Sequence, residues 1–201
     1  MARGEVNHPY NERVATHHLD PIVGNLHGAF SRDIAPALTI DPGDTVIFRT
    51  LDADWNLAPR TSTRYEDPPA KFAPIPAGQE TGHARQGDGE VSVTAIECPM
   101  EHVALEFELL TDMPLRAPRA HTPTGWVTFG LHKDLNQAAL LALEDMVNLM
   151  MARDGLTRHQ ALGLASVLVD LRVTQIVNEV SGVHAVLAHD AYARGPAPKP
   201  L

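Results

Sequence analysis

The stretch Gln86-Gly87-Asp88-Gly89-Glu90 alternates small and acidic residues and runs directly into a β-branched sequence, Val91-Ser92-Val93-Thr94. Glycine permits backbone angles and close approaches that a Cβ atom forbids, so this stretch predicts a tight loop. Alternation along the following strand places Glu90, Ser92 and Thr94 on one face and Val91, Val93 and Ala95 on the other.

The two carboxylates of this loop repel each other, so the loop needs a cation, a shared proton or solvent around it. A tight acidic loop that opens a buried strand can hold oxygen ligands for a hard metal ion, or position a water nucleophile. A solvated hairpin turn fits the same spacing. Asp88 and Glu90 are therefore candidate site residues with a plain structural alternative.

The composition is ordinary for a globular protein, with 44% hydrophobic and 20% charged residues among 201. We expect a single domain over residues 1–201 with a sizeable core. The net charge of −9 argues against nucleic acid as a partner, and no apolar run reaches membrane-spanning length. The start of the chain shows no secretory signal, so we expect a cytoplasmic protein. Cys98 is the sole cysteine, which excludes an internal disulfide and a cysteine-rich zinc site.

The N-terminal half indicates β structure. Residues 37–40 and 45–51 read as strands joined by Asp41-Pro42-Gly43-Asp44, a type II turn sequence in which Gly43 takes a positive φ. Residues 52–82 are rich in proline and predict an irregular stretch. Residues 91–97 and 103–110 then predict an antiparallel strand pair.

The C-terminal half indicates a helical hairpin over residues 134–169. Asp134 or Asn136 can cap its first helix, Gly155 ends that helix, and Thr157 with Gln160 forms a capping box for the second. The residues expected to point inward on the two helices are Leu135, Ala139, Leu143, Met146, Val147, Met150, Ala161, Leu164, Ala165 and Leu168. Short strands are expected at 122–130, at the edge of a sheet, and at 170–178 and 182–187. The predicted fold is mainly β, a sandwich or distorted barrel with a C-terminal helical hairpin, and α+β overall.

Several histidines are candidates on chemistry alone. His17 and His18 are adjacent, so a strand would point them to opposite faces, and we interpret both as surface residues. His27 lies near Arg32 in the sequence. In one interpretation His27 is a metal ligand or a base and Arg32 binds a polar substrate; in the other, both belong to an exposed loop. His184 lies among apolar neighbours, which favours a hydrogen-bonded core histidine over a ligand.

Three groups of segments carry longer motifs. The first is HGAFSRDI at 27–34 with LTIDPGDTV at 38–46; the second is GHA at 82–84, QGDGE at 86–90 and TAIECPME at 94–101; the third is DLRVTQIVN at 170–178 with GVHA at 182–185. In this order they closely resemble the signatures of the acetamidase/formamidase family. The resemblance covers nearly the whole chain.

One departure from the family is large. Family members carry a central section with a Gly-Gly-Asn-Met-Asp motif between the first two signatures, and residues 50–85 do not resemble it. The simplest account is an internal deletion whose edges meet at Thr81-Gly82-His83-Ala84. His83 therefore fits either the end of the N-terminal portion or the central signature.

The resemblance implies hydrolysis of short aliphatic amides, such as formamide and acetamide, to a carboxylate and ammonia on a largely β fold. A divalent metal, zinc or calcium, would suit this chemistry, with His27, His83, Asp88 and Glu90 as its ligands. The catalytic candidates are Asp88 and Glu90 as bases, with Arg32 and Asn178 orienting the amide or donating to the oxyanion.

A second function class stays open beside the hydrolase. The missing central section favours a catalytically silent family member that is retained as a binding or assembly module. For the hydrolase the expected partner is a small amide substrate, with no nucleic acid and no membrane. A loss of core strands would expose sheet edges, so we also expect a homo-oligomer.

Overall fold

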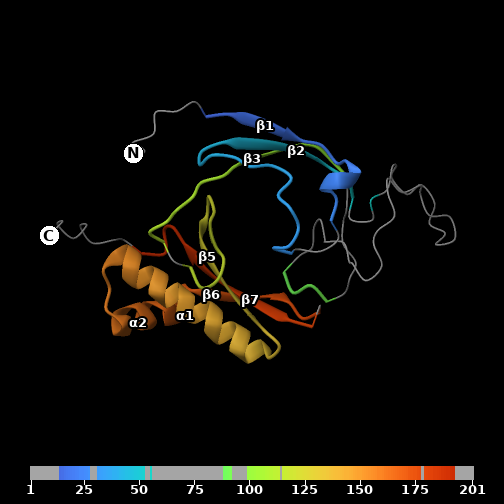
Figure 1. The fold of residues 1–201 in the computed structure, drawn as a ribbon. Coiled ribbons are helices and arrows are strands. Elements are labelled where there is room, and N and C mark those ends of the chain that lie inside the picture. The colour runs from blue at the N-terminus through green and yellow to red at the C-terminus, as the bar shows by residue number, and fades with distance from the viewer. Residues whose placement is uncertain are drawn as a thin grey trace. The chain divides into compact units, whose positions relative to one another are not determined.

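The computed structural model describes residues 14–27, 31–52, 55, 88–91, 99–113, 115–177 and 179–192 (Figure 1). The chain divides into two compact units. The N-terminal unit comprises Met1–Arg85 and Ala95–Asp112, and the C-terminal unit comprises Gln86–Thr94 and Met113–Leu201. Most of the proline-rich stretch 52–82 lies outside the described residues, and the single domain over 1–201 stays a prediction. In the described part of the chain, no helix combines the length and apolarity needed to cross a membrane.

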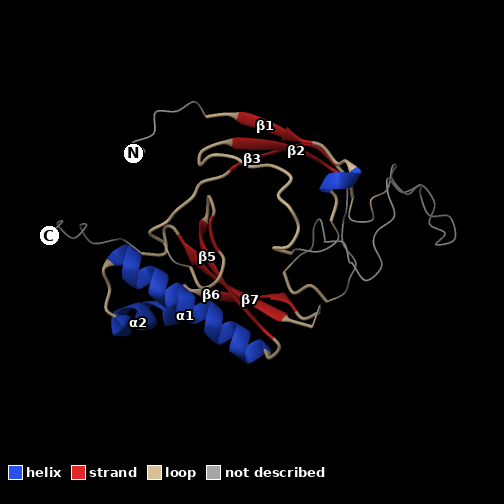
Figure 2. Ribbon diagram, viewed as in Figure 1, coloured by secondary structure: helices blue, strands red, loops and turns tan. Residues whose placement is uncertain are grey.

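The N-terminal unit contains a three-stranded sheet. Its strands are β1 (Thr16–Leu19), β2 (Thr45–Thr50) and β3 (Met100–Glu106), and the 3-10 helix η1 (Val23–Asn25) follows β1 (Figure 2). β2 is central and pairs parallel with β1 and antiparallel with β3. The predicted turn before β2 is confirmed, because Gly43 has a φ of +91° and the Asp44 N–H donates to the Asp41 carbonyl at 3.1 Å.

Some strand predictions in this unit are wrong. Residues 37–40 form no strand, and the strand expected at 103–110 is shifted to Met100–Glu106. β3 instead pairs with β2, a strand that lies far earlier in the chain. Of the strand predicted at 91–97, residues 92–97 lie outside the described residues. Val91, directly after the acidic loop, is 73% exposed, so the loop does not open into a buried strand at this position.

A buried carboxylate joins the start of β1 to the turn before β2. Asp44 is 4% exposed and accepts hydrogen bonds from the Ala15 N–H at 2.8 Å and the Asp41 N–H at 3.2 Å. Its other close partner is His17, with Nε2 2.7 Å from Oδ2. The hydrogen bond to His17 and then that from Ala15 hold the pKa of Asp44 below its ordinary value. The interpretation of His17 as a surface residue is therefore wrong, whereas His18 is exposed as expected.

The C-terminal unit contains a four-stranded sheet in the order β4-β5-β7-β6, antiparallel throughout. Its strands are β4 (Arg119–His121), β5 (Gly125–His132), β6 (Asp170–Gln175) and β7 (Ser181–Ala188). The helices α1 (Leu135–Asp154) and α2 (Arg158–Leu168) separate β5 from β6 along the chain. The edge strand predicted at 122–130 corresponds to β5, but β5 lies between β4 and β7, so β4 and not β5 forms this edge of the sheet.

The predicted caps of both helices are confirmed. The Asp134 side chain accepts from the Gln137 N–H, and Gly155 ends α1 with a φ of +66°. Thr157 and Gln160 form the expected capping box at the start of α2. Each cap satisfies backbone groups that the helix leaves without an internal partner.

The core of this unit lies between the helices and one face of the sheet. Its buried residues are Ala138, Ala142, Met146, Val147, Leu149, Met150, Ala161, Ala165, Val183, Ala185 and Leu187. Leu135 was expected to point inward and is 37% exposed, while Ala139, Leu143, Leu164 and Leu168 pack at the border of the core. Thr128 on β5 donates its hydroxyl to the Ala142 carbonyl at 2.8 Å, which ties the middle of α1 to the sheet.

Gly130 brings β5 and α1 into close contact. A Cβ atom at Gly130 would lie 1.9 Å from the Ala138 carbonyl oxygen and 2.5 Å from the Ala142 backbone nitrogen. Small residues on the facing surfaces therefore set the separation between helix and sheet. The fold class is confirmed as mainly β with a helical hairpin and α+β overall, and no closed barrel occurs among the described strands.

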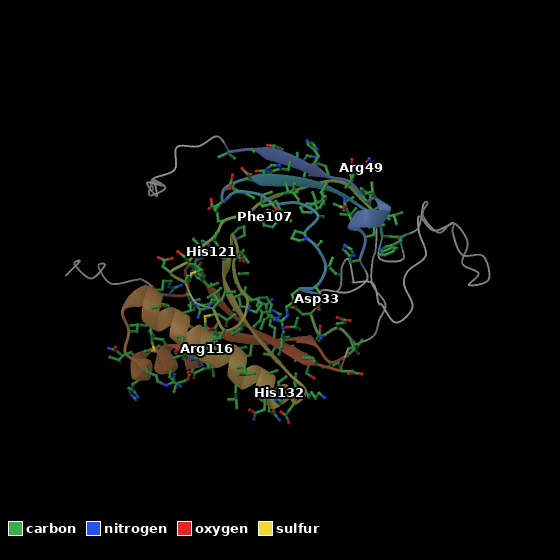
Figure 3. All side chains as sticks on the ribbon, in the orientation of Figure 1. Asp33, Arg49, Phe107, Arg116, His121 and His132 are labelled. Carbon is green, nitrogen blue, oxygen red and sulfur yellow. The ribbon has the colours of Figure 1, made fainter. Side chains whose placement is uncertain are left out.

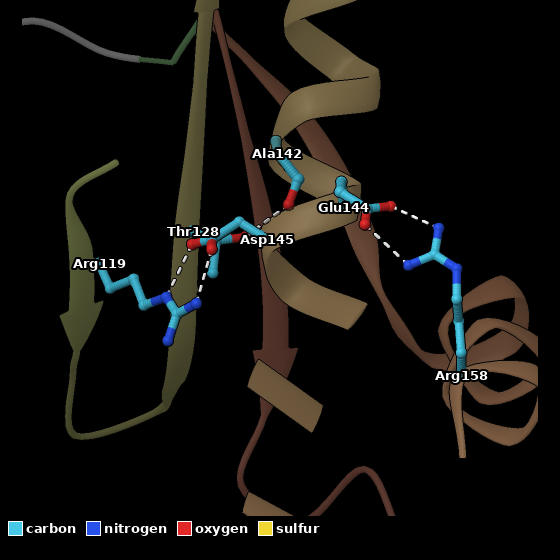
Figure 4. Close-up of polar contacts among 6 residues, drawn as sticks. All are labelled: Arg119, Thr128, Ala142, Glu144, Asp145 and Arg158. Carbon is cyan, nitrogen blue, oxygen red and sulfur yellow. Dashed lines mark hydrogen bonds and ion pairs between the residues drawn. The ribbon is translucent and has the colours of Figure 1, made fainter. Parts of the chain in front are cut away.

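Neighbouring acids on α1 form two ion pairs of different burial (Figure 4). Asp145 accepts two hydrogen bonds from Arg119 of β4, at 2.7 and 2.6 Å. The Arg119 side chain is 21% exposed and that of Asp145 is 13% exposed. This pairing raises the pKa of Arg119. Glu144 forms an equally short bidentate pair with Arg158 of α2, but these side chains are 48% and 55% exposed.

We expect Asp145→Ala to lower the free energy of unfolding by about 2–3 kcal/mol, because it leaves the Arg119 guanidinium largely buried without its partner. Glu144→Ala, one residue away on the same helix, is expected to cost less than about 1 kcal/mol, since water replaces an exposed partner. Urea denaturation followed by far-UV circular dichroism measures both. Equal losses from the two variants would contradict the assignment.

Candidate functional site

The acidic loop is bound to the edge of the C-terminal sheet by main-chain hydrogen bonds. The N–H groups of Gly89 and Glu90 both donate to the Thr174 carbonyl oxygen at 3.1 Å, and the Ile176 N–H donates to the Glu90 carbonyl at 3.1 Å. Glu90 thereby forms a parallel bridge with Gln175 next to β6. Gly89 has a φ of +77°, where a side chain is strained, which confirms the predicted need for a glycine.

Strand register decides which side chains the loop meets. Val183, Ala185 and Leu187 of β7 point into the helix-covered core, so His184 points to the opposite face. Arg172 of β6 is paired directly with His184 and shares that face. We call this the site face, defined by Arg172, Thr174 and His184.

The Asp88 carboxylate lies against the site face. One oxygen is 3.6 Å from Arg172 Nη1 and the other is 3.7 Å from His184 Nε2. Both distances exceed those of a hydrogen bond, so Asp88 is attracted by its neighbours without being locked to them. The Asp88 side chain is 56% exposed and that of His184 only 11%, so the carboxylate is accessible from solvent while the neighbouring imidazole is largely buried.

Two further contacts fix the imidazole of His184. Its Nδ1 lies 2.9 Å from Thr174 Oγ1, and its ring centroid lies 6.1 Å from that of Phe129 on β5. The prediction of a buried, hydrogen-bonded histidine is therefore correct, and the same ring also faces an acid. A base, two hydrogen-bond donors and an apolar wall together suit a polar neutral substrate that undergoes attack by water.

The predicted site residues are distributed over both units. Asp88 and Glu90 lie in the docked loop of the C-terminal unit, whereas His27 and Arg32 are exposed loop residues of the N-terminal unit. Next to Arg32, Asp33 lies in a turn and its N–H donates to Ser31 Oγ at 3.1 Å (Figure 3). His83 and Asn178 fall outside the described residues.

The sequence analysis assigned no site role to Arg172, Thr174 or His184. A signal was present, since Asp170, Arg172 and Thr174 repeat a polar residue at every second position of β6. Such alternation indicates a polar sheet face. It does not say which distant histidine or acid meets that face.

The described residues supply only part of a metal site. Asp88 and His184 offer carboxylate and imidazole donors, a combination that zinc accepts. In the parts of the chain that the structure describes, no group of three histidine, cysteine or acidic side chains could hold an ion. The positive charge of Arg172 next to Asp88 also competes with a cation for that carboxylate.

Three solved structures are similar to this chain over most of its length. An acetamidase from Yersinia enterocolitica matches with a TM-score of 0.66 and 16% identity, covering 92% of this chain and 95% of its own. A predicted acetamidase/formamidase from the thermophile Thermoanaerobacter tengcongensis gives 0.70 and 15%, covering 88% and 96%. An acetamidase from Bacillus halodurans gives 0.53 and 16%, covering 78% and 92%. The chain has the acetamidase fold.

No protein-family model and no curated protein matched the sequence. At 15–16% identity the structural likeness establishes the acetamidase fold alone. Within that fold, the site face carries the cluster of Asp88, Arg172 and His184. The resemblance found in the sequence is thus confirmed in three dimensions.

Proposed function

We propose that this chain hydrolyses short aliphatic amides, with formamide and acetamide as the reference substrates. The observation that carries the proposal is the half-exposed Asp88 carboxylate facing the buried His184 imidazole at 3.7 Å on the site face. The acetamidase fold supports it, since the structural neighbours include two proteins described as acetamidases.

In the proposed reaction Asp88 acts as general base and then as general acid. It takes one proton from a water molecule as the water oxygen bonds to the amide carbon. His184 and Arg172 donate hydrogen bonds toward the negative charge that develops on the carbonyl oxygen. Asp88 returns its proton to the nitrogen as the C–N bond breaks, which leaves a carboxylic acid and ammonia.

A divalent ion remains part of the proposal, with Asp88 as one donor and His83 as a predicted further ligand. When bound, such an ion would polarise the amide carbonyl. Roles for His27, Glu90, Arg32 and Asn178 stay predictions, as do the cytoplasmic setting and the homo-oligomer. The exposed side chains of Leu140, Leu141 and Val167 on the two helices support association of copies.

The test is ammonia release by the purified full chain from formamide and acetamide, with zinc or calcium added and with a chelator. We expect ammonia in proportion to enzyme and time, and loss of this activity with chelator if the ion takes part. Binding of amide without turnover under every metal condition would instead support a silent binding module and would end the hydrolase proposal.

A further inference from the structure

One residue of β6 contacts both His184 and the loop that carries Asp88. The Thr174 carbonyl oxygen accepts the two N–H groups of the loop that carries Asp88, each at 3.1 Å. The Thr174 hydroxyl lies 2.9 Å from Nδ1 of His184. The main chain and the side chain of one residue therefore act on different partners, so a substitution can remove one contact and keep the other.

Hydrogen-bond chemistry decides which nitrogen of His184 carries the proton. A neutral imidazole carries a proton on only one of its nitrogens, and an ionised carboxylate only accepts hydrogen bonds. His184 Nε2 faces the Asp88 carboxylate, so that nitrogen is favoured as the N–H. Nδ1 then presents a lone pair and must accept a hydrogen bond from Thr174 Oγ1. In the opposite tautomer, the Nε2 lone pair would face the negatively charged carboxylate, and the Nδ1 N–H would donate to the Thr174 hydroxyl, which can itself either donate or accept.

We propose that Thr174 is a positioning residue whose hydroxyl stabilises the Nε2–H tautomer of His184 that Asp88 favours, while its carbonyl holds the Asp88 loop in place. The hydroxyl fixes the ring so that its donor faces Asp88 and the space beside it. Under the proposed function, on which the kinetic consequence rests, this donor is the one directed at the developing oxyanion. In this proposal Thr174 acts on the reaction through His184 and the Asp88 loop and not directly on the substrate.

The test compares Thr174→Val with Thr174→Ser in the full chain. Valine keeps the β-branched shape and the carbonyl but removes the hydroxyl, whereas serine keeps the hydroxyl. The readout is nitrogen NMR of ¹⁵N-histidine-labelled protein, at a pH where the ring is neutral. The His184 signals are identified by their loss in His184→Gln. We expect Nε2–H in the parent and in Thr174→Ser, and a mixture of tautomers in Thr174→Val.

The kinetic readout is the division of the effect between kcat and KM. Thr174→Val is expected to lower kcat about five- to tenfold, the weight of one neutral hydrogen bond, with KM changed less than about twofold. Thr174→Ser should restore kcat to within about twofold. A parent protein with Nδ1–H, or an unchanged tautomer in Thr174→Val, would overturn the proposal. Because NMR needs no turnover, failure of the hydrolase proposal and failure of this one are distinguishable.

Discussion

Replacing Gly130 by alanine is expected to lower the free energy of unfolding of the C-terminal unit by about 4 kcal/mol, enough to leave much of it unfolded. The new Cβ would lie 1.9 Å from the Ala138 carbonyl oxygen and 2.5 Å from the Ala142 nitrogen. Both are backbone atoms in the middle of α1, so no side chain can rotate out of the way. The helix must shift from the sheet, which opens the packing around Met146 and Met150.

Gly163→Ala is the matched control for this prediction. Gly163 lies inside α2, and an added Cβ there meets nothing within 4 Å. Alanine favours helix over glycine, so this variant is expected to gain about 0.5–1 kcal/mol. Urea denaturation followed by circular dichroism measures both substitutions. A Gly130→Ala protein as stable as the parent would show that the close contact between β5 and α1 is wrong.

The second large effect is expected at the base. Asp88→Asn should reduce ammonia release at least about 100-fold, because the amide cannot take the proton from water. The isosteric change keeps the shape of the side chain, and the loop is held by main-chain hydrogen bonds that do not involve residue 88. The fold should therefore survive, which circular dichroism checks.

Glu144→Gln serves as the control for charge removal, since Glu144 is an exposed acid on α1, a helix that packs on the other side of the sheet from the site face. It is expected to keep parental kcat and KM. Asp88→Asn with parental turnover would remove Asp88 from the mechanism. A large loss in both variants would point to a general effect of charge and would equally contradict the assignment.

Local signals in the sequence predicted much of the fold. The caps at Asp134, Gly155 and Thr157 and the turn at Gly43 depend on contacts within a few residues, which is why they could be placed correctly. Strand pairing depends on distant segments. The parallel pairing of β1 with β2, the pairing of β3 with β2 and the inner position of β5 all needed information that no window of sequence contains.

The same division holds for the candidate site. Asp88 could be named as a candidate because glycines on both sides of an acid are a local pattern. The role proposed for His184 was not predicted, since its position next to Asp88 arises only when β7, β6 and the acidic loop are aligned side by side. Arg172 joins them through a register that pairs it with His184 across two strands.

The acidic loop is attached to β6 through its main chain, so the position of the loop does not depend on the side chain that carries the proposed chemistry. Its position depends on peptide groups and on one glycine, so the identity of the side chain at residue 88 is not needed to put the loop there. The side chain at residue 88 can therefore be replaced, by mutation in nature or by design, and the new side chain will occupy the same position. Such a scaffold is well suited to acquiring new reactions, or to losing an old one, without having to refold.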